Sequence, residues 1–229
     1  MKDDRASIRT NQDQSGFTLV ELSLAMTFLA FIMLFVIVVI MQMINIYNKS
    51  ISLSQINQAG RQLMSDLNGG ARFASPSSKS VWPTTGVPNR MCIGGVSYVW
   101  NLADQTTHKP TMANQFGDGK SLSLIRVKDD NGSLCGGATL PASTDGKVAI
   151  IVGSNVLVQS LTVGQGGTGN GLLRVDVTLS TAGGNAPQLK DSGKPASASN
   201  LTCFYNNSSN NFCAFSEYNF VIYQRGATK

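Results

Sequence analysis

The chain has 229 residues, a length that allows one good-sized domain plus an appendage. Charged residues make up 14% of it, against about 25% in typical soluble domains, while hydrophobic residues make up 42%. This composition excludes an acidic disordered tail, a collagen and a coiled-coil rod. The formal net charge of +5 indicates a mildly cationic surface, and without a basic stripe it does not indicate nucleic-acid binding.

A long apolar segment near the N-terminus is the first feature of the chain. Residues 22–47 contain no charged side chain. As a helix they would extend about 39 Å, which is enough to cross a hydrocarbon core of about 30 Å. Apolar side chains lie all round such a helix, so it has no polar face for water. A secretory signal would have a shorter apolar region, of about 7–15 residues, before a small-residue cleavage site. The segment is therefore predicted to span a membrane.

One acidic residue lies at the start of this apolar stretch. Glu21 occupies a position where a carboxylate is costly unless it is paired or protonated. One interpretation is that Glu21 marks the membrane interface at the helix N-terminus, where the helix dipole favours an anion. The residues around it support a second interpretation.

The segment around Glu21 has a specific sequence. Residues 15–25 read Ser-Gly-Phe-Thr-Leu-Val-Glu-Leu-Ser-Leu-Ala and lead directly into the apolar segment. They resemble the cleavage and methylation motif of type IV prepilins, a family that includes the pseudopilins of type II secretion. The resemblance covers about residues 15–46. It implies that a prepilin peptidase removes residues 1–16 as a cytoplasmic leader, cutting after Gly16, and N-methylates the new terminus at Phe17.

The same resemblance implies a mode of assembly. Glu21 is expected to pair with the Phe17 amine of a neighbouring subunit as the helices pack into a filament. Because an unpaired charge in that environment is costly, this pairing would set the axial offset between subunits. The implied partners are the prepilin peptidase, other pilin subunits, an inner-membrane assembly platform with its ATPase, and the lipid bilayer before assembly. No nucleic-acid partner and no cofactor are expected.

Two features depart from the pattern of major pilins. Many of those have a helix-breaking proline at the position of Val38, whereas this chain has no proline between residues 16 and 75. The leader is also longer than is common, and its three basic residues are balanced by three aspartates. Lys and Arg still favour a cytoplasmic N-terminus. Both departures favour a minor pilin over a major one.

Beyond residue 47 the apolar pattern becomes amphipathic. Apolar residues recur at three- to five-residue steps as far as Leu67, with polar residues between them. We expect one helix over residues 17–68 that ends at Gly69-Gly70, where glycine can adopt the left-handed conformation of a C-cap. Its outer half is predicted to pack on a globular domain. A coiled-coil partner is the alternative, but the stripe spans barely three heptads and lacks e/g charge pairs.

The rest of the chain, residues 71–229, is predicted to be a β-rich domain that begins with a proline-containing irregular connection over 71–95, with at most one short element in it. Strand-like segments follow at 96–102, 121–127, 148–152, 156–163, 172–180 and 218–224. Asp-Gly or Asn-Gly pairs mark turns at Gly119, Gly132 and Gly146. The predicted fold class is α+β, with the long N-terminal helix packed on an antiparallel β-sheet. The pilin resemblance implies the same arrangement.

All four cysteines lie after the apolar segment, as expected for a domain that faces an oxidising exterior. Four cysteines allow three pairings, and pairing of nearest neighbours gives Cys92–Cys135 and Cys203–Cys213. A Cys203–Cys213 bridge also resembles the disulfide-bounded loop near the C-terminus of many pilins. The alternative is a zinc site made by all four thiolates, but no two cysteines have C-x2-C or C-x4-C spacing.

Patterns for catalysis are weak. His108 is the only histidine, so a two-histidine metal site cannot be built, and no G-x-S-x-G surrounds a serine. A G-x-G-x-x-G at residues 164–169 leads into a strand instead of opening a helix, and is predicted to be a hairpin loop. Asp129-Asp130-Asn131 lacks the rest of a calcium loop and is predicted to be a turn. Neither an enzyme nor a metal site is expected.

The sequence therefore favours a non-catalytic filament subunit, a minor pilin of a type IV pilus-like filament. A pseudopilin of a type II secretion system is the alternative within the family. The alternative of another class is a single-pass membrane-anchored receptor or binding protein. The expected location is the membrane, with a cytoplasmic N-terminus and an extracytoplasmic C-terminal domain, and then the cell-surface filament.

Overall fold

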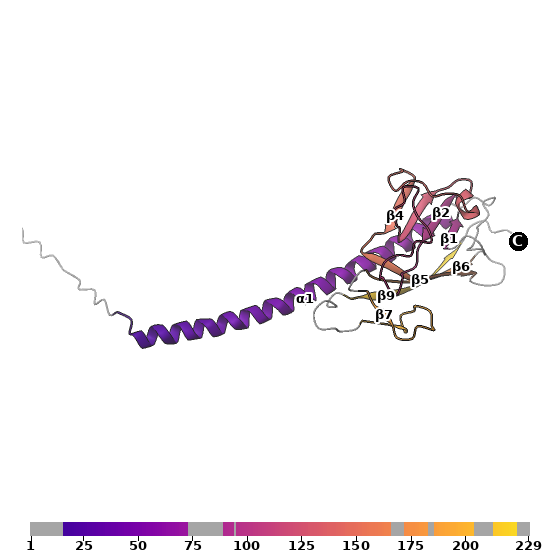
Figure 1. The fold of residues 1–229 in the computed structure, drawn as a ribbon. Coiled ribbons are helices and arrows are strands. Elements are labelled where there is room, and N and C mark those ends of the chain that lie inside the picture. The colour runs from indigo at the N-terminus through magenta and orange to yellow at the C-terminus, as the bar shows by residue number, and fades with distance from the viewer. Residues whose placement is uncertain are drawn as a thin grey trace, which may run out of the picture. The chain divides into compact units, whose positions relative to one another are not determined.

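The computed structural model describes residues 16–72, 89–93, 95–165, 172–182, 186–203 and 213–223. Residues 1–15 of the predicted leader, residues 73–88 of the predicted connection and residues 166–169 of the predicted hairpin loop lie outside the described residues. The chain divides after Ile44 into two compact units. The part of the first that the structure describes is mostly apolar helix, and the second is an α+β domain (Figure 1).

One continuous helix, α1, spans Leu19–Arg72 and has 54 residues (Figure 1). The predicted end at Gly69-Gly70 is wrong, because both glycines lie within the helix. The last turn is held by packing, since Ala71 is only 1% exposed. A Cβ on Gly70 would lie 3.1 Å from the Tyr98 hydroxyl, so this glycine allows a close approach of helix and sheet. Tertiary contacts thus outweigh the tendency of glycine to end a helix.

Within the second unit, α1 packs one face against the sheets. Its buried residues recur mainly at three- to four-residue steps and are Ile56, Ala59, Gly60, Leu63, Leu67 and Ala71. Polar contacts also attach the C-terminal part of α1 to the strands. Arg126 Nη1 lies 2.7 Å from Asp66 Oδ1, and the Tyr98 hydroxyl donates to the Asp66 carbonyl oxygen at 3.1 Å. Burial, assisted by the Asp66 carboxylate, raises the pKa of Tyr98, so its hydroxyl stays a donor. The prediction that this half of the helix packs on a globular domain is confirmed.

The larger of two main sheets has four antiparallel strands in the order β1-β2-β3-β4. Its strands are β1 (Arg90–Ile93), β2 (Val96–Trp100), β3 (Leu124–Lys128) and β4 (Val148–Val152). A short 3-10 helix, η1 (Ser133–Gly136), lies between β3 and β4 in the chain.

The second main sheet has three antiparallel strands in the order β5-β6-β9. Its strands are β5 (Val156–Gln165), β6 (Leu172–Thr181) and β9 (Phe215–Tyr223). A short pair, β7 (Gln188–Leu189) and β8 (Leu201–Thr202), completes the described strands. The α+β class is confirmed, and the domain has two main sheets where the sequence predicted one.

Each predicted strand segment contains a strand, although the bounds differ by up to a few residues. β1 is a short element within the predicted connection over 71–95, but its strand type was not predicted, because its four residues have no alternating pattern and three of them are buried. Burial on both faces removes the two-residue period by which a strand is recognised.

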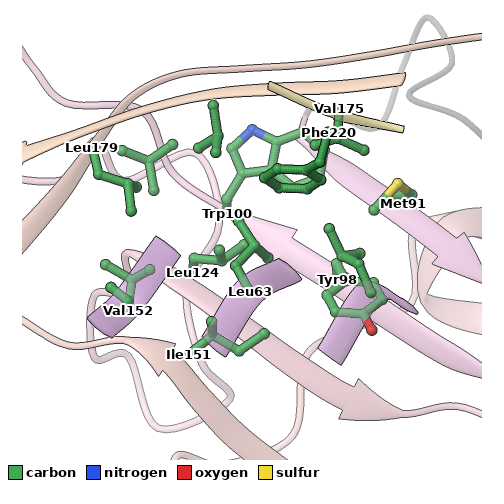
Figure 2. Packing of buried hydrophobic residues seen from close by; sticks show 14 of the residues in the cluster. Leu63, Met91, Tyr98, Trp100, Leu124, Ile151, Val152, Val175, Leu179 and Phe220 are labelled. Carbon is green, nitrogen blue, oxygen red and sulfur yellow. The ribbon is translucent and has the colours of Figure 1, made fainter. Parts of the chain in front are cut away.

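The main core lies between α1 and the two sheets. Trp100 of β2 is 2% exposed, and it belongs to one cluster with Leu63 of α1, Val175 of β6 and Phe220 of β9. Figure 2 shows its indole ring on the side of the cluster where Val175 and Phe220 lie. A second cluster covers the other face of the four-stranded sheet and contains Val99, Phe116, Leu122, Ile125, Val127, Leu134 and Leu140.

Two disulfide bonds link cysteines that are 43 and 10 residues apart in the chain. Cys92 of β1 is bonded to Cys135 of η1, and Cys203 after β8 is bonded to Cys213 before β9. These are the pairs that nearest-neighbour pairing predicts. Disulfides of this kind are typical of domains outside the reducing cytoplasm.

Candidate processing and assembly site

Three described residues, Gly16, Phe17 and Thr18, precede α1. Gly16 and Phe17 lie just before the helix, and the Phe17 side chain is 85% exposed. Among the described residues, and apart from the chain neighbours of Gly16, no atom lies within 4 Å of the position that a Gly16 Cβ would occupy. In this part of the chain, no described side chain crowds Gly16.

Thr18 and Glu21 form a reciprocal cap at the helix N-terminus. The Glu21 backbone N–H donates to Thr18 Oγ1 at 3.3 Å. In return, the Thr18 backbone N–H and hydroxyl both donate to Glu21 Oε2 at 3.1 Å. This arrangement is a capping box, which satisfies donors that a helix N-terminus otherwise leaves unpaired. Sequence reasoning missed the role of Thr18, although Thr-x-x-Glu before an apolar segment is its signal.

The capping box changes how the Glu21 charge is understood. Within a single chain the carboxylate has two donors at Oε2, so it is not an isolated charge. Among the described residues, no hydrogen bond reaches its other oxygen, Oε1. The interpretation of Glu21 as a helix N-terminal anion therefore holds for the single chain, and one carboxylate oxygen remains open to a further donor.

The helix of the first unit exposes apolar side chains along its length. An 18-residue window reaches a mean hydropathy of 3.0, and none of that window is buried. Among the described residues, α1 is the one helix long and apolar enough to cross a membrane. It also runs without interruption through Val38, where many major pilins have a proline. This surface requires lipid or other apolar helices around it.

The hydroxyl groups in this part of the helix are satisfied internally. Ser23 donates to the Val20 carbonyl oxygen at 2.9 Å, and Thr27 donates to those of Ser23 and Leu24 at 3.0 and 2.8 Å. Because of these bonds to the preceding turn, neither the Ser23 hydroxyl nor the Thr27 hydroxyl is a free donor facing hydrocarbon. These polar residues are therefore compatible with a helix surrounded by lipid or by other helices.

Two of the residues considered for catalysis or metal binding, His108 and Asp129, lie in turns of the globular domain. His108 lies in a turn with a φ of 52°, where its backbone N–H donates to the Asp104 carbonyl oxygen at 2.9 Å. In the part of the chain that the structure describes, no group of three His, Cys, Asp or Glu side chains is arranged to hold a metal ion.

Asp129 supports the turn between β3 and η1. Its carboxylate accepts hydrogen bonds from the Ser97 hydroxyl at 2.7 Å, the Leu134 N–H at 2.9 Å and both donors of Ser133 at 3.1 Å. Burial alone would raise the pKa of Asp129, but these bonds outweigh it and lower the pKa below its usual value. The segment is thus a turn, as predicted, with a structural carboxylate in it.

Neither a family model, a curated protein nor a solved structure matches the chain. The architecture is nevertheless pilin-like, because a long apolar N-terminal helix is followed by an α+β domain in which the same helix packs on antiparallel sheets. The N-terminal helix is long and apolar enough to span a membrane, and the two disulfides are typical of an extracytoplasmic domain.

Proposed function

We propose that this protein is a structural, non-catalytic subunit, a minor pilin, of a type IV pilus-like filament. It is processed after Gly16 and assembles through the apolar part of α1. One observation carries the proposal: the Gly16, Phe17 and Glu21 motif lies at the start of α1, a 54-residue helix whose N-terminal part exposes apolar side chains along its length.

The exposed apolar surface of α1 supports a subunit role, because such a helix can move from one apolar environment, the bilayer, to another, the filament. Before assembly the bilayer surrounds the helix, and in the filament neighbouring helices replace the lipid. Apolar side chains are never transferred to water in this exchange, so it avoids a large hydrophobic penalty. The Ser23 and Thr27 hydroxyls are bonded to carbonyl oxygens within the helix, so they need no partner from lipid or from neighbouring helices.

The geometry at Glu21 supports the predicted charge pairing. Cleavage after Gly16 creates a positively charged amine at Phe17, and methylation by the prepilin peptidase retains this charge. Among the described residues, Glu21 Oε1 accepts no hydrogen bond, while Oε2 accepts two from Thr18. The Phe17 amine of a neighbouring subunit would bind at Oε1 without breaking the capping box. Pairing of two charges in an apolar environment would then fix the axial offset between subunits.

The proposal includes a set of partners and a location. The partners are the prepilin peptidase, other pilin subunits, an inner-membrane platform with its ATPase, and the bilayer before assembly. Before assembly the N-terminus is cytoplasmic and the disulfide-containing domain is extracytoplasmic. The subunit then enters a surface filament. Absence of a helix break at Val38 supports a minor subunit over a major one.

Mass spectrometry of the N-terminal peptide from sheared surface filaments tests this proposal directly. A peptide that begins with N-methyl-Phe17 is the expected result, because it reports processing and assembly together. Full-length protein confined to the membrane, with residue 1 or 2 still at its terminus, would contradict the proposal and would support a membrane-anchored receptor.

Two variants separate processing from assembly. Gly16→Leu is expected to leave an uncleaved membrane precursor, since a bulky side chain then precedes the scissile bond. Glu21→Ala is expected to be cleaved normally but to enter filaments poorly. Thr27→Ala is the matched control in the same helix, because the Thr27 hydroxyl donates to the carbonyl oxygens of Ser23 and Leu24 in the preceding turn. Normal filament levels of Glu21→Ala would exclude the pairing role.

A further inference from the structure

The two disulfide bonds of the domain differ in how far solvent reaches them. Cys92 and Cys135 are both buried, at 4% and 7% exposed. In the other bond, Cys213 is 6% exposed, but Cys203 is an exposed residue that follows β8. Thiol–disulfide exchange begins when a thiolate reaches one sulfur of the bond, and exposed disulfides are commonly the labile or regulatory ones. Access therefore favours exchange at Cys203.

Burial is not the only protection of Cys92. Its Sγ lies 2.8 Å from Ser97 Oγ. The Ser97 hydroxyl donates its hydrogen to Asp129 Oδ2 at 2.7 Å, and a disulfide sulfur carries no hydrogen, so a bare serine oxygen faces the sulfur. A thiolate at Cys92 would lie beside this oxygen and near the Asp129 carboxylate, and both disfavour a negative charge. Exchange that releases Cys92 is thus opposed by charge as well as by lack of access.

The backbone on both sides of the Cys203–Cys213 bond is held by contacts other than the disulfide. Next to Cys213, the Ala214 N–H donates to Thr181 Oγ1 at 3.2 Å, and the Thr181 N–H donates to the Ala214 carbonyl oxygen at 3.0 Å. Before Cys203, Leu201 is 1% exposed, and β8, in which it lies, pairs with β7. Opening of this bond therefore leaves its neighbours attached to the domain.

We propose that Cys203–Cys213 is a redox-active site, which a dithiol protein opens by attack on Cys203, whereas Cys92–Cys135 is a permanent bond. One thiolate of the dithiol attacks Cys203 Sγ, so that a mixed disulfide forms there and Cys213 leaves as a thiolate. The second thiol of the dithiol then displaces Cys203. The dithiol is thereby oxidised to a disulfide, both cysteines are reduced, and the two protons of the dithiol pass to their thiolates. The site is independent of the proposed filament role, because assembly through α1 uses none of these residues.

The test uses dithiothreitol as the dithiol probe and the full chain in detergent micelles. Samples are quenched at intervals with an alkylating reagent, and mass spectrometry measures the labelled fraction of each cysteine. Cys203 and Cys213 are expected to be labelled at least about tenfold faster than Cys92 and Cys135. Amides of β6 and β9 are expected to remain protected from hydrogen exchange after this first reduction. Oxidised glutathione is expected to restore the bond.

Two single-residue variants locate the point of attack, and each is the control for the other because both lose the same bond. Cys213→Ser leaves Cys203 as a free thiol, and Cys203→Ser leaves Cys213. With oxidised glutathione, Cys213→Ser is expected to form a mixed disulfide at least about tenfold faster than Cys203→Ser, since Cys203 is the exposed partner.

Three results would overturn the proposal. The first is reduction of Cys92–Cys135 at the same rate as Cys203–Cys213, or faster. The second is loss of amide protection in β6 and β9 when Cys203–Cys213 opens, because the bond would then be a structural one. The third is an equal rate of mixed-disulfide formation in the two variants, which would exclude Cys203 as the preferred point of attack.

Discussion

The ring of Tyr218 in β9 lies against the backbone of Gly60 in α1. A Cβ at Gly60 would come within 2.6 Å of the ring carbon Cζ, closer than non-bonded atoms approach. The same tyrosine donates a hydrogen bond of 2.7 Å to Asn57 Oδ1, one turn earlier in the helix. Gly60 is therefore required by the close approach of a sheet to the helix, although alanine is the better helix former.

Gly60→Ala is expected to destabilise the globular domain by about 1–3 kcal/mol, because overpacking outweighs the gain in helix propensity of about 1 kcal/mol. Denaturant unfolding of the full chain in detergent measures the effect. Gly69→Ala is the control, since outside its own helix no atom of the described residues lies within 4 Å of the added methyl group, and this variant is expected to gain stability. Equal gains in the two variants would show that Tyr218 does not constrain Gly60.

Asp129→Asn is expected to destabilise the domain by about 1–3 kcal/mol, because an amide NH2 cannot accept the bonds that Ser97 and Leu134 now donate. Asp130→Asn provides the comparison at the neighbouring residue. Asp130 is exposed and its nearest cation, Lys128 Nζ, is 3.9 Å away, so its loss should change stability by less than about 0.5 kcal/mol. A similar small effect at both positions would contradict the structural role of Asp129.

The contribution of Asp129 is also expected to depend on pH. Its pKa is lowered in the folded state, so its stabilising effect is fully present above the unfolded value of about 3.9. It is lost as the pH falls through the folded-state pKa. The difference in unfolding free energy between the wild-type chain and Asp129→Asn should therefore be constant at pH 5–7 and should shrink below about pH 4. A difference that stays constant down to pH 2 would contradict a stabilising role for the ionised Asp129 carboxylate.

The two disulfides are expected to contribute unequally. Loop-closure entropy predicts about 4 kcal/mol for Cys92–Cys135, which closes 43 residues, and about 3 kcal/mol for Cys203–Cys213, which closes 10. Replacement of each pair by alanine, followed by denaturant unfolding, measures the two contributions. Greater destabilisation on removal of Cys203–Cys213 would contradict this order.

Thr18→Ala is expected to weaken the N-terminal turn of α1 by about 1 kcal/mol, because the capping box loses its hydroxyl. Amide hydrogen exchange at residues 19–22 of the full chain in detergent measures this loss. Thr18→Ser retains the hydroxyl and should exchange at nearly the wild-type rate. Equal exchange in the alanine and serine variants would exclude a capping role for this residue.

Local patterns in the sequence are sufficient to predict much of the fold. Residues 22–47 predict a helix because an uncharged apolar segment of this length is suited to an apolar environment. In such an environment a single segment can satisfy its backbone hydrogen bonds only as a helix. Alternation in residues 172–180 predicts β6, since a strand with one wet face repeats every two residues. Gly119 and Gly132 predict turns, and both have the positive φ that favours glycine, at 78° and 64°.

Features that depend on distant residues were decided only by the tertiary structure. The helix continues past Gly69-Gly70 because the core buries Ala71 and Tyr98 approaches Gly70. The strands divide between two main sheets, and the short strand β1 pairs with β2 within one of them, for similar reasons of packing. Propensity and periodicity act over a few neighbouring residues, whereas the free energy of burial depends on which residues meet across the core. The sequence alone therefore determined the membrane-length helix and its motif, and packing determined where that helix ends and how the strands are grouped.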